Sequence, residues 1–130
     1  RLADWVKASD EDMQTLGLTQ VHLGNADALA AHWRARGAQR MALTFGAQGA
    51  WLGVDDAHAQ DAAPTVPVVD TVGAGDTFWG NCLADWLHTP TGAAQRVAHT
   101  LAHAMRAAAL NCTRAGCAPP TRAEVLNAGA

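Results

Sequence analysis

The chain has 130 residues, 49% of them hydrophobic, and its nine basic and twelve acidic residues give a formal charge of -3. This length suits one ordinary domain with a packed core, and the lack of a basic stripe argues against nucleic acid as a partner. The apolar runs are too short for a transmembrane helix. Three cysteines, an odd number, argue against a disulfide scaffold and for the reducing cytoplasm. Residues 1–4 carry neither a start methionine nor a signal-peptide pattern, so we expect the chain to begin within a longer protein.

The N-terminal quarter predicts a strand followed by two helices. Residues 2–8 form an apolar run typical of a short buried strand. Ser9 is a suitable helix N-cap, and the acidic residues 10–12 behind it suit the positive end of a helix dipole. A second helix is expected over residues 25–37, where a glycine ends it.

The middle of the chain predicts strands separated by turns. Residues 40–45 and 50–54 are apolar runs typical of strands, and the glycine-flanked residues 46–49 form the turn between them. Residues 55–64 are polar and rich in alanine, which predicts a loop or an edge hairpin. The β-branched residues 66–69 predict a further strand.

The C-terminal half predicts two long helices and a short one. Residues 74–87 and 93–110 carry apolar side chains at helical spacing, and Thr121 is expected to cap the last helix. Strands that alternate with helices of this length predict an α/β fold, with a mostly parallel sheet and helices on both faces.

The most informative segment is a glycine turn at the start of the helix expected from residue 74. Its Gly73-Ala74-Gly75 run is followed by Asp76, and N–H groups at such a helix start bind anions. A Walker A loop needs a lysine after its second glycine, but the chain's one lysine, Lys7, lies far away in sequence. A dinucleotide fingerprint needs a third glycine at residue 78, which is a phenylalanine.

Two interpretations of this turn remain open. In the first, the helix start holds a transferring phosphoryl group while Asp76 takes the proton of the acceptor. In the second, Asp76 is only a capping residue of a glycine-rich turn.

Histidine and cysteine pairs in the second half of the chain predict no metal centre. His99 and His103 lie one helical turn apart, but the glutamate of a zinc-binding helix is missing between them. Cys112 and Cys117 have four residues between them, unlike a zinc knuckle, and are expected to be ordinary thiols.

Residues 70–78, Asp-Thr-Val-Gly-Ala-Gly-Asp-Thr-Phe, closely resemble the C-terminal signature of the ribokinase-like, or PfkB, carbohydrate kinases. Three further blocks resemble parts of that family in the same order: residues 6–12, 43–50 and 109–116. Within the family, the run 111–116 and the tail 119–121 look most like bacterial fructokinases.

The resemblance implies a three-layer αβα ribokinase-like fold and an ATP-dependent, fructokinase-like sugar kinase. Residues 1–130 would be the C-terminal, nucleotide-side part of a single kinase domain. The family's Gly-Gly sugar-binding motif and its β lid are missing, so we expect the isolated chain to be inactive or nearly so. Alternatives are a family kinase for a keto-deoxy sugar acid, ribose or a nucleoside, and a truncated nucleotide-binding module without turnover. A homodimer of the full-length enzyme is one candidate assembly.

The resemblance also implies roles for the glycine turn. Asp76 would be the general base, and the N–H groups of Gly73, Ala74 and Gly75 would form the anion hole. Asp70 and the carbonyl of Val72 match a monovalent-cation site, with potassium as the candidate ion, that the loop 114–117 would complete. The alternative for Asp70 is that it caps the turn.

Further residues match the nucleotide side of the family. Thr44, Gly46 and Gly49 match a turn that contacts the phosphates and ribose, and a plain β-turn is the alternative. Met105 matches the adenine pocket, with an ordinary core methionine as the alternative.

One block departs from the family pattern. Relatives often carry Asn and Glu where this chain reads Lys7-Ala8-Ser9-Asp10-Glu11, and Lys7 replaces the Asn. Asp10 or Glu11 would help to organise magnesium, or both are simply first-turn helix acids.

Overall fold

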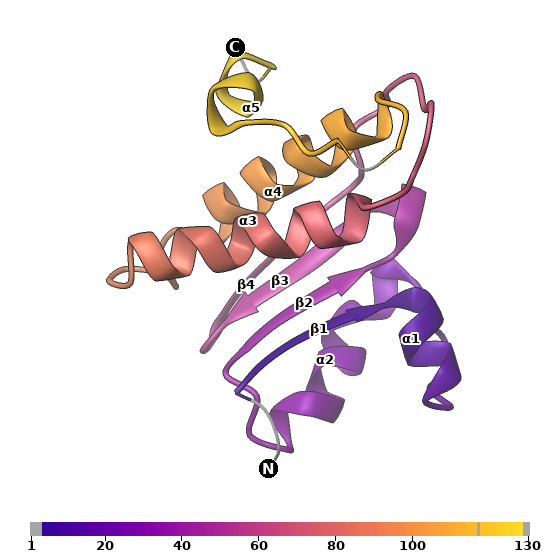
Figure 1. Cartoon of the computed structure of the whole chain (residues 1–130). Helices are drawn as coiled ribbons and strands as arrows, with labels where there is room; N and C mark the ends of the chain where they lie inside the picture. The colour runs from indigo at the N-terminus through magenta and orange to yellow at the C-terminus, as the bar shows by residue number, and fades with distance from the viewer. Residues whose placement is uncertain (1–3, 117, 129–130) are drawn as a thin grey trace.

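The computed structural model describes residues 4–116 and 118–128, which form a sheet between two groups of helices (Figure 1). The strands are β1 (Trp5–Ser9), β2 (Arg40–Thr44), β3 (Ala50–Val54) and β4 (Ala57–Asp61). The helices are α1 (Asp10–Thr15), α2 (Ala26–Arg34), α3 (Ala74–His88), α4 (Val97–Cys112) and α5 (Arg122–Ala128), with short 3-10 turns η1 (Leu23–Asn25) and η2 (Gly46–Gln48). In Figure 1, α3 and α4 cover one face of the sheet and α2 the other, so the predicted three layers are confirmed. None of the helices in the described part of the chain is long and apolar enough to cross a membrane.

The sheet is mixed rather than mostly parallel. Its strands lie in chain order, and only the pairing of β1 with β2 is parallel, whereas β2–β3 and β3–β4 are antiparallel. The connections explain the difference. The segment 10–39 contains two helices and is long enough for a crossover, whereas residues 45–49 and 55–56 are tight turns that reverse the chain.

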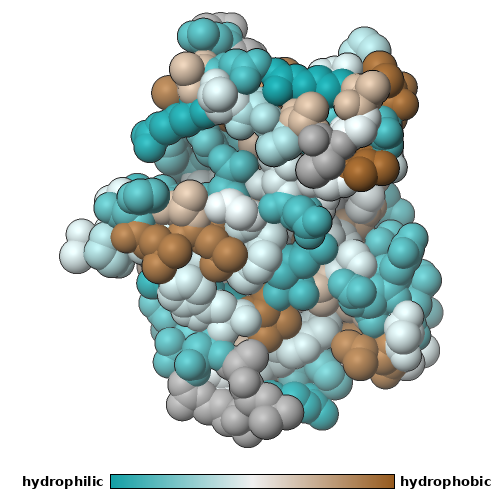
Figure 2. Space-filling view, viewed as in Figure 1, coloured by the Kyte–Doolittle hydropathy of each residue, from teal (hydrophilic) through white to brown (hydrophobic). Residues whose placement is uncertain are grey.

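The strand expected at residues 66–69 is absent, because this segment pairs with no strand of the described sheet. Val68 and Val69 are 62% and 63% exposed. The N–H groups of Val69 and Asp70 donate instead to the carbonyl of Cys112 at 2.7 and 3.1 Å. Figure 2 shows hydrophobic surface at the upper right, the side where Figure 1 draws the link between β4 and α3.

Each face of the sheet has its own core, because side chains of a strand alternate between the faces. Met41, Leu43 and Trp51 pack beneath the sheet with α1 and α2. Leu52 and Val54 pack above it against α3 and α4. The sheet is therefore covered on both sides, and the carboxyl ends of β1 and β2 remain at one edge of the layers.

Helix α4 begins at Val97, later than the predicted residue 93, because Arg96 is held by the preceding turn. Its guanidinium donates to the carbonyls of Thr89 and Thr91 and to the carboxylate of Asp85. The predicted caps at Ser9 and Thr121 are confirmed, since each hydroxyl accepts a hydrogen bond from a backbone N–H in the first turn of its helix.

Candidate functional site

A cavity of about 680 Å³ lies where the carboxyl ends of β1 and β2 meet the amino end of α3 and one side of α4. These ends share one side of the molecule in Figure 1. Crevices at the carboxyl ends of strands are the usual ligand sites of open α/β sheets. The cavity brings together four segments that are far apart in sequence, with these lining residues among others: Lys7, Asp10, Glu11, Thr44, Gly46, Gly49, Ala74, Gly75, Met105 and Cys112.

The amino end of α3 is shaped for an anion. Gly73 is its N-cap and has φ 78°, a left-handed backbone conformation that residues other than glycine rarely adopt. The N–H groups of Gly73, Gly75 and Asp76 have no hydrogen-bond acceptor among the described residues, whereas that of Ala74 donates to the Thr71 carbonyl at 3.2 Å. Three unpaired N–H groups at a helix start attract negative charge. Of the expected anion hole, Gly73 and Gly75 therefore have free N–H groups, and Ala74 does not.

Asp76 lies beside this group but outside the cavity lining. It is exposed in the first turn of α3, whereas its neighbour Gly75 lines the cavity. The carboxylate is therefore open to an acceptor that approaches the edge of the cavity from outside.

The turn after β2 closes the opposite wall of the cavity. Thr44, Gly46 and Gly49 all line it, as the nucleotide-turn interpretation requires. Gly49 has φ 128°, and a Cβ added there would lie 2.0 Å from the carbonyl oxygen of Asp61. Only glycine therefore fits between this turn and β4.

Met105 is a core residue that also reaches the cavity. It is 6% exposed and packs in the core above the sheet, and it also lines the cavity. A thioether at this place gives the cavity an adaptable apolar wall.

Two carboxylates line the cavity at the start of α1. Asp10 and Glu11 occupy the first helical turn, and the capping box of that helix uses Ser9 and Asp12 instead. Hydrogen bonds from the Ser9 N–H first, and then from its hydroxyl, hold the pKa of Asp12 below its usual range. The part of the chain that the structure describes has no cluster of three or more His, Cys, Asp or Glu that could hold a metal ion. Two carboxylates still suit magnesium, which binds through few protein ligands together with substrate phosphates.

The carboxylate of Asp70, where a cation site is expected, accepts two backbone hydrogen bonds. One carboxylate oxygen accepts from the Val72 N–H at 3.0 Å and the other from the Gly116 N–H at 3.1 Å. These two contacts, the Val72 N–H first, lower the pKa of Asp70. Asp70 therefore caps the turn, as the alternative predicted. Cys117, the end of the loop expected to complete the site, lies outside the described residues.

Asn111, which sequence reasoning missed, supports the glycine turn from outside the cavity lining. Its side chain is fully buried; its amide donates to the Val72 carbonyl at 2.7 Å and its oxygen accepts from the Ala118 N–H at 3.2 Å. Asn111 lies ten residues, nearly three helical turns, after Leu101 and shares its buried face. That periodicity is the signal that could have identified a buried asparagine.

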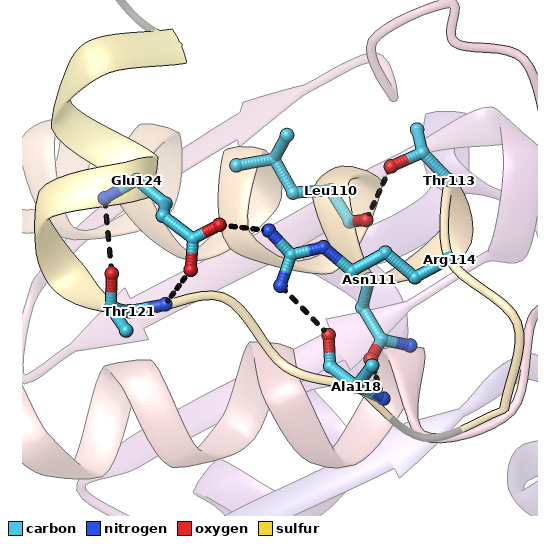
Figure 3. Close-up of polar contacts among 7 residues, drawn as sticks. All are labelled: Leu110, Asn111, Thr113, Arg114, Ala118, Thr121 and Glu124. Atoms are coloured by element: carbon cyan, nitrogen blue, oxygen red, sulfur yellow. Dashed lines mark hydrogen bonds and ion pairs between the residues drawn. The ribbon is translucent and has the colours of Figure 1, made fainter.

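The loop after α4 is fixed to the last helix, as Figure 3 shows. The Arg114 guanidinium donates to the Ala118 carbonyl and to the Glu124 carboxylate. Glu124 in turn accepts from the Thr121 N–H, and this bond first and Arg114 next lower the pKa of its carboxyl. These contacts hold the loop that presents Gly116 to Asp70.

Comparison with known proteins gives one family. The model of the pfkB family of carbohydrate kinases matches residues 1–124. A fructokinase from Rhizobium leguminosarum bv. trifolii is 48% identical over 82 residues, which are 63% of this chain and 24% of that protein.

Solved structures agree with this result. A Vibrio cholerae fructokinase bound to fructose, ADP and calcium is 29% identical with a TM-score of 0.77, over 97% of this chain and 41% of that one. A putative ribokinase II from E. coli, in complex with ATP and Mg²⁺, is 23% identical with a TM-score of 0.76, over 97% of this chain and 39% of that one.

The chain therefore spans 24% of the curated relative's length and 41% of the solved fructokinase's. Within that part, the ribokinase-like fold expected from the resemblance is confirmed. Because the family model matches 124 of 130 residues, the chain belongs to the pfkB family of carbohydrate kinases.

Proposed function

We propose that this chain is the C-terminal, nucleotide-side part of an ATP-dependent sugar kinase whose first candidate acceptor is fructose. The observation that carries the proposal is the set of unpaired N–H groups at the amino end of α3, between a cavity and an exposed carboxylate. Its relatives include a fructokinase at 48% identity. Ribose, nucleosides and keto-deoxy sugar acids are the alternative acceptors.

The reaction would use Asp76 as its base. A sugar hydroxyl oxygen forms a bond to the γ-phosphorus of ATP while the bond from that phosphorus to the β,γ-bridging oxygen breaks, and ADP leaves with the bonding electron pair. The hydroxyl proton passes to the Asp76 carboxylate. The N–H groups of Gly73, Gly75 and Asp76 stabilise the charge on the γ-phosphoryl oxygens, which is the main task of the protein in this chemistry.

The nucleotide would occupy the cavity. Its phosphates and ribose lie against the turn that carries Thr44, Gly46 and Gly49, and its adenine lies near Met105. The Asp10 and Glu11 carboxylates would hold a hydrated Mg²⁺, which neutralises phosphate charge when bound. Since the reaction consumes ATP, we also propose a cytoplasmic location.

A potassium ion beside Asp70 is a further part of the proposal. The Asp70 carboxylate and the Val72 carbonyl keep lone pairs beyond the hydrogen bonds that they accept. Activity would be compared in potassium and in a larger inert monovalent cation. Equal activity in the two salts would discard the potassium site.

The test of the kinase function is ADP release by the enzyme that carries this chain, measured with fructose, ribose, adenosine and keto-deoxy sugar acids. Fructose-dependent release that Asp76→Asn abolishes supports the proposal. Release with another acceptor alone would reassign the substrate. Nucleotide binding without release in any of the four would favour a nucleotide-binding module over a kinase.

A further inference from the structure

Lys7, the chain's only lysine, places a half-buried cation beside the amino end of α3. It comes from the middle of β1, where it pairs with Ala42, and its side chain lines the cavity. A Cβ added to Gly75 would lie 3.1 Å from Lys7 Nζ and 3.9 Å from Cε. The ammonium group therefore lies on the side of Gly75 where a side chain would project, beside the first turn of α3.

No anion in the described part of the chain neutralises this ammonium group. Among the described residues, no carboxylate lies within 4.0 Å of Lys7 Nζ, and no hydrogen-bond acceptor is found for it. Lys7 does act on Asp12 at longer range, but as the smallest of the causes that lower the pKa of that carboxyl. The carboxylates of Asp10 and Glu11 line the same cavity without forming an ion pair with it.

The position of this charge is unfavourable in the absence of a ligand. The amino end of a helix carries partial positive charge, so a cation placed there is repelled. Partial burial adds to that cost because the ammonium group loses water without gaining a partner. An anion bound between Lys7 and the free N–H groups of Gly75 and Asp76 would relieve both effects at once.

We propose that Lys7 binds the γ-phosphoryl group of ATP from the strand side of the cavity, opposite the N–H groups of α3. This inference rests on the proposed kinase function. Of the three phosphates, the γ-phosphoryl group must lie nearest the base Asp76, and Lys7 lies beside Gly75, the residue immediately before that base. As a compact point charge, the ammonium group follows the phosphoryl oxygens through the transfer, whereas a planar guanidinium demands fixed geometry.

The first experiment compares two nucleotides. The enzyme that carries the chain, as wild type and as Lys7→Met, is titrated with ADP and with β,γ-methylene-ATP. This analogue keeps the γ-phosphate but does not transfer it. We expect the affinity of Lys7→Met for the methylene analogue to fall by about 10-fold or more, the value of a charge-assisted hydrogen bond. We expect its affinity for ADP to stay within about 2-fold. Arg34→Met, which removes an exposed cation on α2, is the matched control and should change neither affinity.

The second experiment measures turnover by the enzyme that carries the chain. We expect Lys7→Met to lower kcat by about 10² to 10³-fold, as removal of one preorganised donor does, and to leave the KM for the sugar unchanged. Gly75→Ala places a methyl group 3.1 Å from Nζ and should lower kcat less in the Lys7→Met background than in wild type. If Lys7→Met does not fold, as judged by circular dichroism, Lys7→Gln takes its place in both experiments.

Four outcomes would overturn the inference. Lys7→Met that binds the analogue and turns over like wild type removes any role for the charge. Equal losses of affinity for ADP and for the analogue would show that Lys7 does not bind the γ-phosphate specifically. If the wild-type enzyme binds neither nucleotide, both the proposed function and this inference are overturned. If turnover falls in Asp76→Asn but not in Lys7→Met, only this inference is overturned.

Discussion

The side-chain amide of Asn111 donates a 2.7 Å hydrogen bond to the carbonyl oxygen of Val72, 39 residues earlier in the chain. The bond joins the last turn of α4 to the residue just before the glycine turn. Asn111 also accepts from the Ala118 N–H, so one fully buried side chain ties together the helix, the turn and the following loop.

Asn111→Ala should therefore destabilise the chain. The substitution leaves the Val72 carbonyl and the Ala118 N–H without their partner, at a cost of about 1–3 kcal/mol in the free energy of unfolding. Urea denaturation would measure this change, with Asn127→Ala on the exposed face of α5 as the control. Equal stability of the two variants would show that the bond is not needed to hold the turn.

In the enzyme that carries this chain, Asp76→Asn should abolish the proposed kinase activity and leave the fold intact. The amide keeps the size of the side chain but cannot accept the sugar proton, so we expect kcat to fall by at least ~10²-fold. Asp56→Asn, in the exposed turn between β3 and β4, is the matched control. Near-normal turnover of the Asp76 variant would show that Asp76 is not the base.

Gly49 and Gly80 should respond in opposite directions to alanine. A Cβ at Gly49 collides with the Asp61 carbonyl at 2.0 Å, and its φ of 128° is strained for alanine. We expect Gly49→Ala to lose about 2–4 kcal/mol of stability. Gly80 lies inside α3 with nothing within 4 Å of an added Cβ, and Gly80→Ala should gain about 0.5–1 kcal/mol. Thermal unfolding of both variants checks the pair, and destabilisation of both would refute the steric argument.

Asp70 should make stability depend on pH in the acid range. Its pKa is lowered in the folded chain, chiefly by the Val72 N–H and then by the Gly116 N–H. In acid, the unfolded state therefore binds more protons than the folded state does. The stabilisation from Asp70 is present above the unfolded aspartate pKa of about 3.9 and is lost as pH falls through the lower folded pKa.

We therefore expect wild type to be more stable than Asp70→Asn by a constant amount between about pH 5 and pH 7, and the difference to shrink below about pH 4. Urea denaturation across this range measures it, with Asp56→Asn as the control. A difference that does not change with pH would mean that the hydrogen bonds to Asp70 do not favour its charged form.

Local signals predicted much of this fold, and long-range pairing accounts for what they missed. The cap at Ser9 and the helix start at Gly73 follow from side-chain chemistry within a few residues, and both were predictable. The direction of a strand depends on whether its connection to the previous strand is a tight turn or a crossover. The sequence predicted the strand β3 but not its antiparallel direction. The β-branched run at 66–69 predicts an extended backbone, but the sheet offers it no partner.

The same division holds for the candidate site. The glycine turn, Thr44, Gly46 and Gly49 were predictable because their motifs are contiguous, and the cavity brings them together. The contacts of Asn111 with Val72 and of Lys7 with Gly75 join residues far apart in sequence. Spacing along the chain carries no information on such pairs.

Helix α4 connects the apolar wall of the cavity to the glycine turn. Met105 forms the apolar wall and Asn111, six residues later, holds the turn, so about 9 Å of helix rise separates the two positions. One residue inserted between them would lengthen this distance by about 1.5 Å and rotate Asn111 by about 100° away from Val72. A helix, rather than a loop, therefore sets the distance between the apolar wall of the cavity and the glycine turn.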